Sequence, residues 1–228
     1  MARQRIMQRL ARWHIWLGWL VGLPVLMWSV TGLFMVARPI EEVRGDSLQA
    51  APRPIDPASI VLPQFSGPIQ AAHLAQHPDG PVWLVTEADG GRYRYSAHDG
   101  TLIPPVVKEE AQRIADDAYA GPARLESVAY VPADEAPVEL RRKLNSWQAR
   151  FADGTHVYID DATGEVLALR SSQWRLYDLM WGLHIMAPRE REDTSHAALI
   201  IFAALSVIGA GLGCVLLFRR RKARVRAP

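Results

Sequence analysis

The sequence predicts a membrane protein of the α+β class, in which two transmembrane helices flank a tandem domain of helices and antiparallel sheets. Three observations predict this architecture: two long runs without a charged residue, basic segments at both ends of the chain, and a repeat of aromatic and glycine positions between the runs. The whole-chain averages conceal it, because a net charge of +2 and a mean hydropathy of −0.03 combine apolar runs with a polar domain.

The two uncharged runs extend from Trp13 to Ala37 and from Ala197 to Phe218. Each is longer than the roughly 20 residues that a helix needs to cross a hydrocarbon layer of about 30 Å. We therefore predict transmembrane helices over 15–37 and 197–218 rather than buried helices of a soluble protein. The first run ends without a small-x-small cleavage pattern and exceeds the usual signal-peptide core, so we expect it to stay in the protein.

The charges on either side of the runs predict the orientation. Residues 1–14 and 219–228 form basic tails that carry ten Lys and Arg residues and no acidic residue, whereas the segment between the runs has a net charge of −8. By the positive-inside rule both termini are cytoplasmic and the central domain is on the outer side. The C-terminal tail follows a span directly, which favours contact with lipid headgroups over binding to nucleic acid.

Each span also contains a pair of glycines four residues apart, Gly18 with Gly22 and Gly209 with Gly213. Small residues at this spacing allow the backbones of two helices to approach closely in lipid. Because both pairs lie in the cytoplasmic half of the membrane, we predict that the spans pack on each other. A homodimer interface is the alternative.

The central segment repeats itself at an offset of 64 residues, which aligns 83–103 on 147–167. Alternating apolar residues and Asp-Gly or Thr-Gly turns predict a three-stranded meander in each copy. An amphipathic helix is expected over 107–119 before the second meander. A shorter counterpart is expected over 64–76, although Pro68 interrupts it. The two units are thus predicted over 38–104 and 105–170.

Two segments of the second unit, "KEEAQRIADDAY" and "WQARFADGTHVYIDDATGEVLAL", closely resemble a PepSY domain. The segments "RWHIWLGWLVGLPVLMWSVTGLF" and "WRLYDLMWGLHIM" resemble the PepSY-associated transmembrane family, so the resemblance covers nearly the whole chain. It implies a bacterial inner-membrane protein with a periplasmic PepSY pair. Some members are implicated in the reduction of ferric siderophores with haem held by histidines. The larger members have four spans, whereas this sequence has two.

Three histidines at the predicted membrane boundaries are the candidate site: His14, His184 and His196. Ionisable residues at membrane depth are candidates for function, and histidine is a common axial ligand of haem iron. His184, in an aromatic helix predicted to lie in the interface over 171–188, and His196 both belong to the outer face and are able to converge on one iron. His14 lies about 33 Å away, at the inner face. The alternative is that all three anchor the chain at the headgroups.

Elsewhere, His73 and His77 are four residues apart on the expected helix 64–76, a spacing that suits a metal, but no further ligand accompanies them. We expect a solvated face there. No catalytic motif is found, and whether the chain is itself an enzyme or a subunit of a membrane-bound reductase stays open.

The leading hypothesis is transmembrane electron transfer with b-type haem, in the reduction of a ferric siderophore or another metal chelate. The expected partners are the lipid bilayer and a second copy or a redox subunit, without nucleic acid. The alternative is a non-catalytic, membrane-tethered module that binds or regulates a periplasmic protein.

Overall fold

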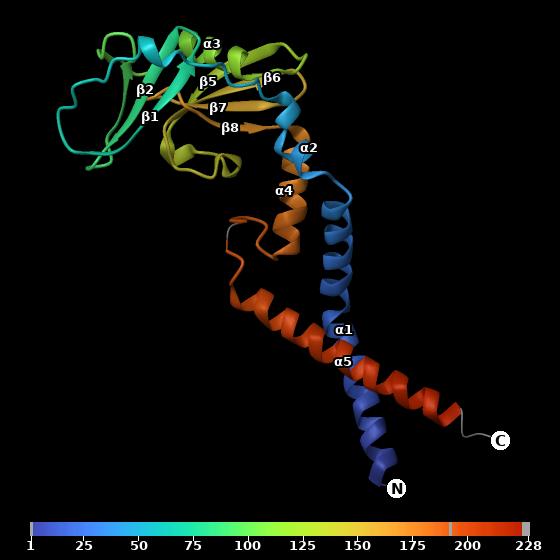
Figure 1. Ribbon diagram of the computed structural model, residues 1–228. Helices are drawn as coiled ribbons and strands as arrows, with labels where there is room; N and C mark the ends of the chain where they lie inside the picture. Colours follow the sequence, from blue (N-terminus) through green and yellow to red (C-terminus); the bar gives the residue numbers. More distant parts are fainter. Residues whose placement is uncertain (1, 192, 225–228) are drawn as a thin grey trace. The chain divides into compact units, whose positions relative to one another are not determined.

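A computed structural model describes residues 2–191 and 193–224 of the chain. It divides into two compact units, one made of Met1–Arg38 with Tyr177–Pro228 and one made of Pro39–Leu176. We call the first the helical unit and the second the β unit (Figure 1). The observed fold confirms the predicted class, with two apolar helices flanking a region of two antiparallel sheets and helices.

The helical unit is built on two long helices, α1 (Ala2–Val36) and α5 (Ala197–Arg224). Both are long and apolar enough to cross a membrane, over Gln4–Val36 and Ala197–Phe218. α1 begins well before the span predicted at 15–37, because the arginine-rich tail continues the same helix. A shorter helix, α4 (Ser172–His184), begins in the β unit and ends in the helical unit.

α1 packs against α5. On α1 the contact includes His14 and Leu17. On α5 it includes Gly209, where an added Cβ would lie 3.9 Å from the Cβ of Leu17. The two spans therefore pack on each other, as predicted.

The glycine pair of α1 does not take part in this contact. A Cβ added at Gly18 or Gly22 would meet nothing within 4 Å. The glycine pair of α1 therefore does not form the contact with α5, which His14 and Leu17 make instead.

The β unit contains two four-stranded antiparallel sheets, each with its strands in sequence order. The helix α3 (Lys108–Ala118), predicted over 107–119, stands between them in the chain, and a short helix α2 (Ile40–Arg44) precedes them. The strands of the first sheet are β1 (Ile69–His77), β2 (Gly80–Glu87), β3 (Arg92–Ser96) and β4 (Leu102–Ile103). Those of the second are β5 (Leu125–Val131), β6 (Ser146–Phe151), β7 (His156–Asp160) and β8 (Val166–Arg170).

The predicted repeat is visible in the register and in the contacts of its tryptophans. Trp83 lies opposite Tyr95, and Trp147 lies opposite Ile159 at the equivalent place in the second sheet. Each indole N–H donates to a backbone carbonyl of the segment that precedes its sheet, over 2.9 Å in the first repeat and 3.0 Å in the second. The first strand of each sheet also has a register irregularity near its start. The two repeats therefore share a backbone plan.

The helix expected over 64–76 is not formed, and most of this segment is strand β1. Pro68 immediately precedes the strand, and pairing with the buried strand β2 outweighs the helix propensity of the alanines. The first repeat therefore has no helix equivalent to α3 directly before its sheet. In its place Phe65 packs edge-on against Tyr95, with ring centroids 5.9 Å apart.

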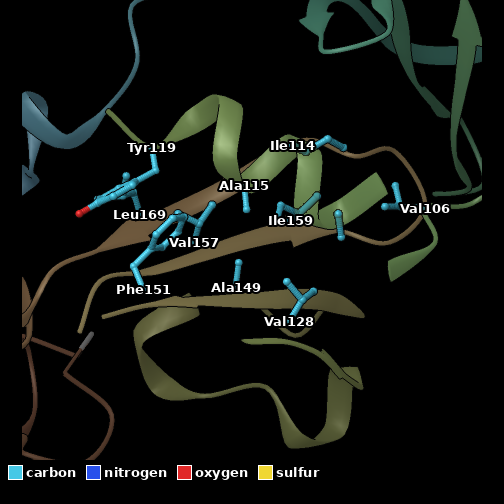
Figure 2. Packing of buried hydrophobic residues seen from close by; sticks show 11 residues of the cluster. Val106, Ile114, Ala115, Tyr119, Val128, Ala149, Phe151, Val157, Ile159 and Leu169 are labelled. Carbon is cyan, nitrogen blue, oxygen red and sulfur yellow. The ribbon is translucent and has the colours of Figure 1, made fainter. Parts of the chain in front are cut away.

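The largest hydrophobic core lies between α3 and the second sheet (Figure 2). α3 contributes the fully or nearly fully buried side chains of Ala111, Ile114 and Ala115, which recur at the three- and four-residue spacing of one helix face. The strands supply the facing residues Val128, Ala149, Phe151, Val157, Ile159 and Leu169.

Polar residues of α3 bind the first sheet. Glu110 receives two hydrogen bonds from the guanidinium of Arg94, at 2.6 and 2.7 Å, and Arg94 is only 2% exposed. Arg113 pairs with Asp79 in the turn between β1 and β2 at 2.8 Å. The single helix α3 thus connects both repeats.

Candidate functional site

His184, the last residue of α4, is held by a hydroxyl of α1. Its Nδ1 lies 2.9 Å from Oγ1 of Thr31. When the hydroxyl of Thr31 donates its single proton to the carbonyl of Met27, over 2.8 Å, Oγ1 accepts from the Nδ1–H of His184. The ring also packs on Gly32, where a Cβ would lie 3.5 Å from the imidazole Cε1.

His14 is held in the same manner at the seam between α1 and α5. Its Nδ1 lies 3.0 Å from the carbonyl oxygen of Gly209, which can only accept, so Nδ1 is again the protonated nitrogen. A Cβ added at Gly213 would lie 3.0 Å from the imidazole Cε1. The absence of a side chain at this glycine therefore makes room for the ring.

Both rings leave Nε2 with a lone pair and without a hydrogen-bond partner among the described residues. Neither Nε2 belongs to the polar atoms that are buried without a partner, and both histidines are half-buried. A histidine that donates its Nδ1–H to an oxygen and presents Nε2 has the tautomer and orientation of a metal ligand. The donor chemistry at His14 and His184 therefore fits an axial ligand of haem.

His196 has a different environment. Its Nε2 donates to the carbonyl of Ile185 over 2.7 Å, and its Nδ1 accepts the backbone N–H of Leu199 over 3.3 Å. It thereby caps the first turn of α5 and ties it to the residue that follows His184. The structure brings the segments of His184 and His196 together. Binding of a metal by His196, however, would break one of its two hydrogen bonds.

The two available imidazoles lie at different levels of the helical unit. His14 and Thr31 are 17 residues apart on the continuous helix α1, which corresponds to about 26 Å along its axis. His14 and His184 are therefore too far apart to bind the same metal ion.

The loop between α4 and α5 is fixed by a buried ion pair that the sequence reasoning did not find. Arg191 binds the carboxylate of Asp178, which is 5% exposed, and its side chain lies over Gly182. The indole of Trp181 donates to the backbone carbonyl of Arg191 over 3.3 Å. This pairing holds the loop on α4, where His184 ends the helix.

The histidine pair of the first repeat does not form a metal site. His73 and His77 lie on one face of strand β1 at a separation of about 13 Å, instead of adjacent on a helix. His73 is exposed as expected, but His77 is 7% exposed and lines a cavity of about 460 Å³ between β1, α3 and the 50–55 segment. Among the described residues, no group of three or more His, Cys, Asp or Glu side chains is arranged to hold a metal ion.

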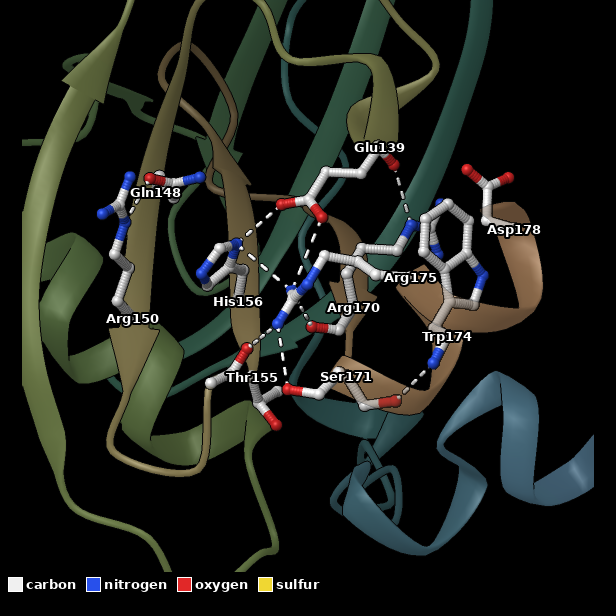
Figure 3. A network of polar contacts seen from close by, with 12 residues as sticks. Glu139, Gln148, Arg150, Thr155, His156, Arg170, Ser171, Trp174, Arg175 and Asp178 are labelled. Atoms are coloured by element: carbon white, nitrogen blue, oxygen red, sulfur yellow. Dashed lines mark hydrogen bonds and ion pairs between the residues drawn. The ribbon is translucent and has the colours of Figure 1, made fainter. Parts of the chain in front are cut away.

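A polar network on the second sheet surrounds Glu139 (Figure 3). Its carboxylate accepts from Nδ1 of His156 and from the hydroxyl of Tyr158, both at 2.6 Å. Burial raises the pKa of Glu139, but the hydrogen bonds from His156 and Tyr158 outweigh it, so the net pKa is lowered. Arg175 in the first turn of α4 reaches the same carboxylate at 3.5 Å. The network anchors the start of α4 on the second sheet.

No curated protein and no solved structure matches the chain. A family model does match it: that of the PepSY-associated TM region aligns with residues 11–228 and so includes both apolar helices and the β unit between them. This match confirms the resemblance found in the sequence and indicates a membrane protein. The chain belongs to the PepSY-associated transmembrane family.

Proposed function

We propose that the protein takes part in transmembrane electron transfer in a bacterial inner membrane, with b-type haem held by His14 and His184. The observation that carries the proposal is that Nδ1 of both imidazoles is hydrogen-bonded, whereas neither Nε2 has a hydrogen-bond partner among the described residues. The termini are cytoplasmic and the β unit periplasmic in this proposal, which the basic tails of the chain support.

Haem bound at these positions would accept and release one electron at a time. The residues of this chain supply one imidazole per site, and Thr31 and the carbonyl of Gly209 fix its orientation. A second copy or a redox subunit would have to supply any further ligand, and the redox subunit would also supply the electrons. The proposed acceptor on the outer side is a ferric siderophore or another metal chelate.

An optical spectrum of the detergent-purified protein, oxidised and then reduced with dithionite, tests the proposal. We expect a Soret band that shifts on reduction. His14→Ala and His184→Ala should each remove part of the band, and the double variant should remove all of it. His98→Ala, at an exposed position of the β unit, is the matched control and should leave the spectrum unchanged.

A protein without a Soret band, even after haem is supplied during expression, contradicts electron transfer through haem. His196→Asn separates the two arrangements at the outer face. Asparagine retains the capping function, so we expect the haem to remain, and loss of the outer-face band would instead make His196 a ligand.

One observation favours the alternative of a tethered binding module, namely the cavity beside His77 in the β unit. A concave, mostly apolar site with a few polar groups is the usual form of a ligand site. A photo-crosslinking residue at position 73, on the rim of this cavity, should capture a periplasmic protein in intact cells if this function holds. Absence of any adduct beyond that of a probe at position 98 would contradict it.

A further inference from the structure

The cavity of about 460 Å³ in the β unit lies where the two repeats meet. Its walls are β1, the helix α3, the turn and strand start at 164–166, and the segment 50–55. Side chains such as those of Leu84 and Ile114 make much of the lining aliphatic. The volume is within the range of about 300–1,000 Å³ that is usual for a small-molecule site.

The segment 50–55 is bound to the other walls. The backbone N–H of Ala50 donates to the carbonyl of Ala118 at the end of α3, over 2.9 Å. The guanidinium of Arg53 binds the carboxylate of Asp117 at 2.7 Å and donates to the carbonyl of His77 over 3.4 Å. A strand or helix of another protein would have to displace this segment in order to enter. The cavity therefore suits a small molecule rather than part of a protein chain.

His77 is the unusual residue of the lining, because it is buried without a hydrogen bond to its ring. It is 7% exposed, and among the described residues only its backbone carbonyl is hydrogen-bonded. Its lowered pKa keeps the imidazole neutral near neutral pH, so the ring presents one donor and one acceptor. Buried polar side chains are nearly always hydrogen-bonded in native proteins. The ring of His77 therefore calls for a partner inside the cavity.

The charges of the lining indicate that this partner is uncharged. Among the described residues, three charged side chains line the cavity, and each is already in an ion pair: Arg53 with Asp117, and Glu165 with Arg92 at 2.9 Å. A charged ligand would have to break one of these pairs or stay uncompensated in a partly buried place, which is costly. A hydroxyl group suits the ring of His77, since it both donates and accepts.

We propose that this cavity binds a small, uncharged and mainly apolar molecule whose hydroxyl group is hydrogen-bonded to the ring of His77. The site lies wholly within the β unit. It depends neither on haem nor on the capture of a periplasmic protein, so the outcome of its test is independent of both.

Protection of a cysteine in the lining tests the proposal on the full chain in lipid nanodiscs. The starting protein is Cys214→Ser, and Ala75→Cys then places a thiol on the same face of β1 as His77. The probe is para-cresol, compared with toluene, which lacks the hydroxyl, and with para-toluate, which is charged. We expect para-cresol to slow modification by a thiol reagent several-fold and para-toluate to have no effect. Ala129→Cys, at an exposed position of β5, is the matched control and should not be protected.

The role of His77 is measured by the preference for para-cresol over toluene, defined as the ratio of their half-protecting concentrations. Both compounds also partition into lipid, but this partition is the same for wild type and for His77→Leu. We therefore expect the preference to fall about two- to tenfold in His77→Leu, the effect of one hydrogen bond. An unchanged preference would refute the proposal, as would protection no greater than that at Ala129→Cys or equal protection by para-toluate.

A second measurement does not depend on the cysteine variants or on the folding of His77→Leu. With ¹⁵N-labelled histidine, the ring signals absent from His77→Gln are those of His77. We expect these signals to shift when para-cresol is added, because the hydrogen bond changes the environment of a ring nitrogen, while those of the exposed His73 stay in place. Ring signals of His77 that do not respond to para-cresol would overturn the proposal.

Discussion

Acidification should destabilise the β unit through His77. The imidazole is 7% exposed and packs below the turn at Gly164, where an added Cβ would lie 2.6 Å from its Cε1. Burial, and after it the positive charge of Arg94, lowers the pKa of His77 from 6.5 to about 4. The negative charges of three carboxylates raise the pKa of His77 but do not restore its ordinary value: Glu110, Asp79 and Asp117.

The size of this destabilisation follows from the difference between the pKa of His77 in the folded and in the unfolded state. The pKa of His77 is 6.5 when unfolded and about 4 when folded. At 1.36 kcal/mol per pKa unit, this difference corresponds to about 3 kcal/mol. Because the folded pKa is depressed, the unfolded chain binds more protons in this range. The stabilisation is complete above the unfolded pKa and is lost as the pH falls through the window to the folded pKa.

Urea unfolding of the full chain in detergent, followed by near-UV circular dichroism, measures this loss at about pH 7 and about pH 4.5. Other acidic groups also titrate in this range, so the quantity of interest is the difference between wild type and His77→Gln. We expect the variant to lose about 2–3 kcal/mol less than the wild type. His73→Gln, an exposed position on the same strand, should behave like the wild type. An equal loss in wild type and His77→Gln would refute the reasoning.

The remaining predictions concern the connection between the repeats. Gly164 has a φ of +74° and little room for a side chain, so Gly164→Ala should lower the free energy of unfolding by more than the about 1–3 kcal/mol of backbone strain alone. Gly90→Ala, with a φ of +90° and open space, should show only the strain, and an equal cost for both variants in urea unfolding would contradict the role of the contact. Arg94→Met should cost about 3–5 kcal/mol because it leaves Glu110 without its buried partner. Arg113→Met, which removes an exposed ion pair, should lower the free energy of unfolding by about 0–1 kcal/mol in the same measurement. Similar losses in the two arginine variants would show that burial does not determine how much each ion pair stabilises the protein.

The sequence predicts the second repeat better than the first. The helix before it has its apolar residues on one face, and the observed helix differs from the predicted bounds by one residue at each end. The segment that became β1 contains alanines and leucine, which suit a helix, and local propensity favours the wrong structure there. What decides it is pairing with β2, a tertiary contact that residue spacing does not reveal.

The candidate histidines were found from their place at the ends of apolar runs. Their hydrogen bonds could not be predicted from the sequence. Thr31 and His184 are 153 positions apart, and His14 and Gly209 are 195 positions apart. Which nitrogen is protonated depends on these long-range partners. Histidine is not among the residue types that usually cap a helix, so the sequence did not indicate that His196 caps α5.

Because α3 supplies the core of the second sheet and also the counter-charge for the first, the duplicated region cannot be divided into two autonomous halves. A fragment that stops at residue 104 would contain Arg94 without its partner Glu110. It would also contain the first sheet without α3, the helix that binds it. The first sheet therefore depends on α3, the helix that precedes the second sheet, for a buried ion pair. Amide exchange of both sheets should accordingly be governed by one common opening event.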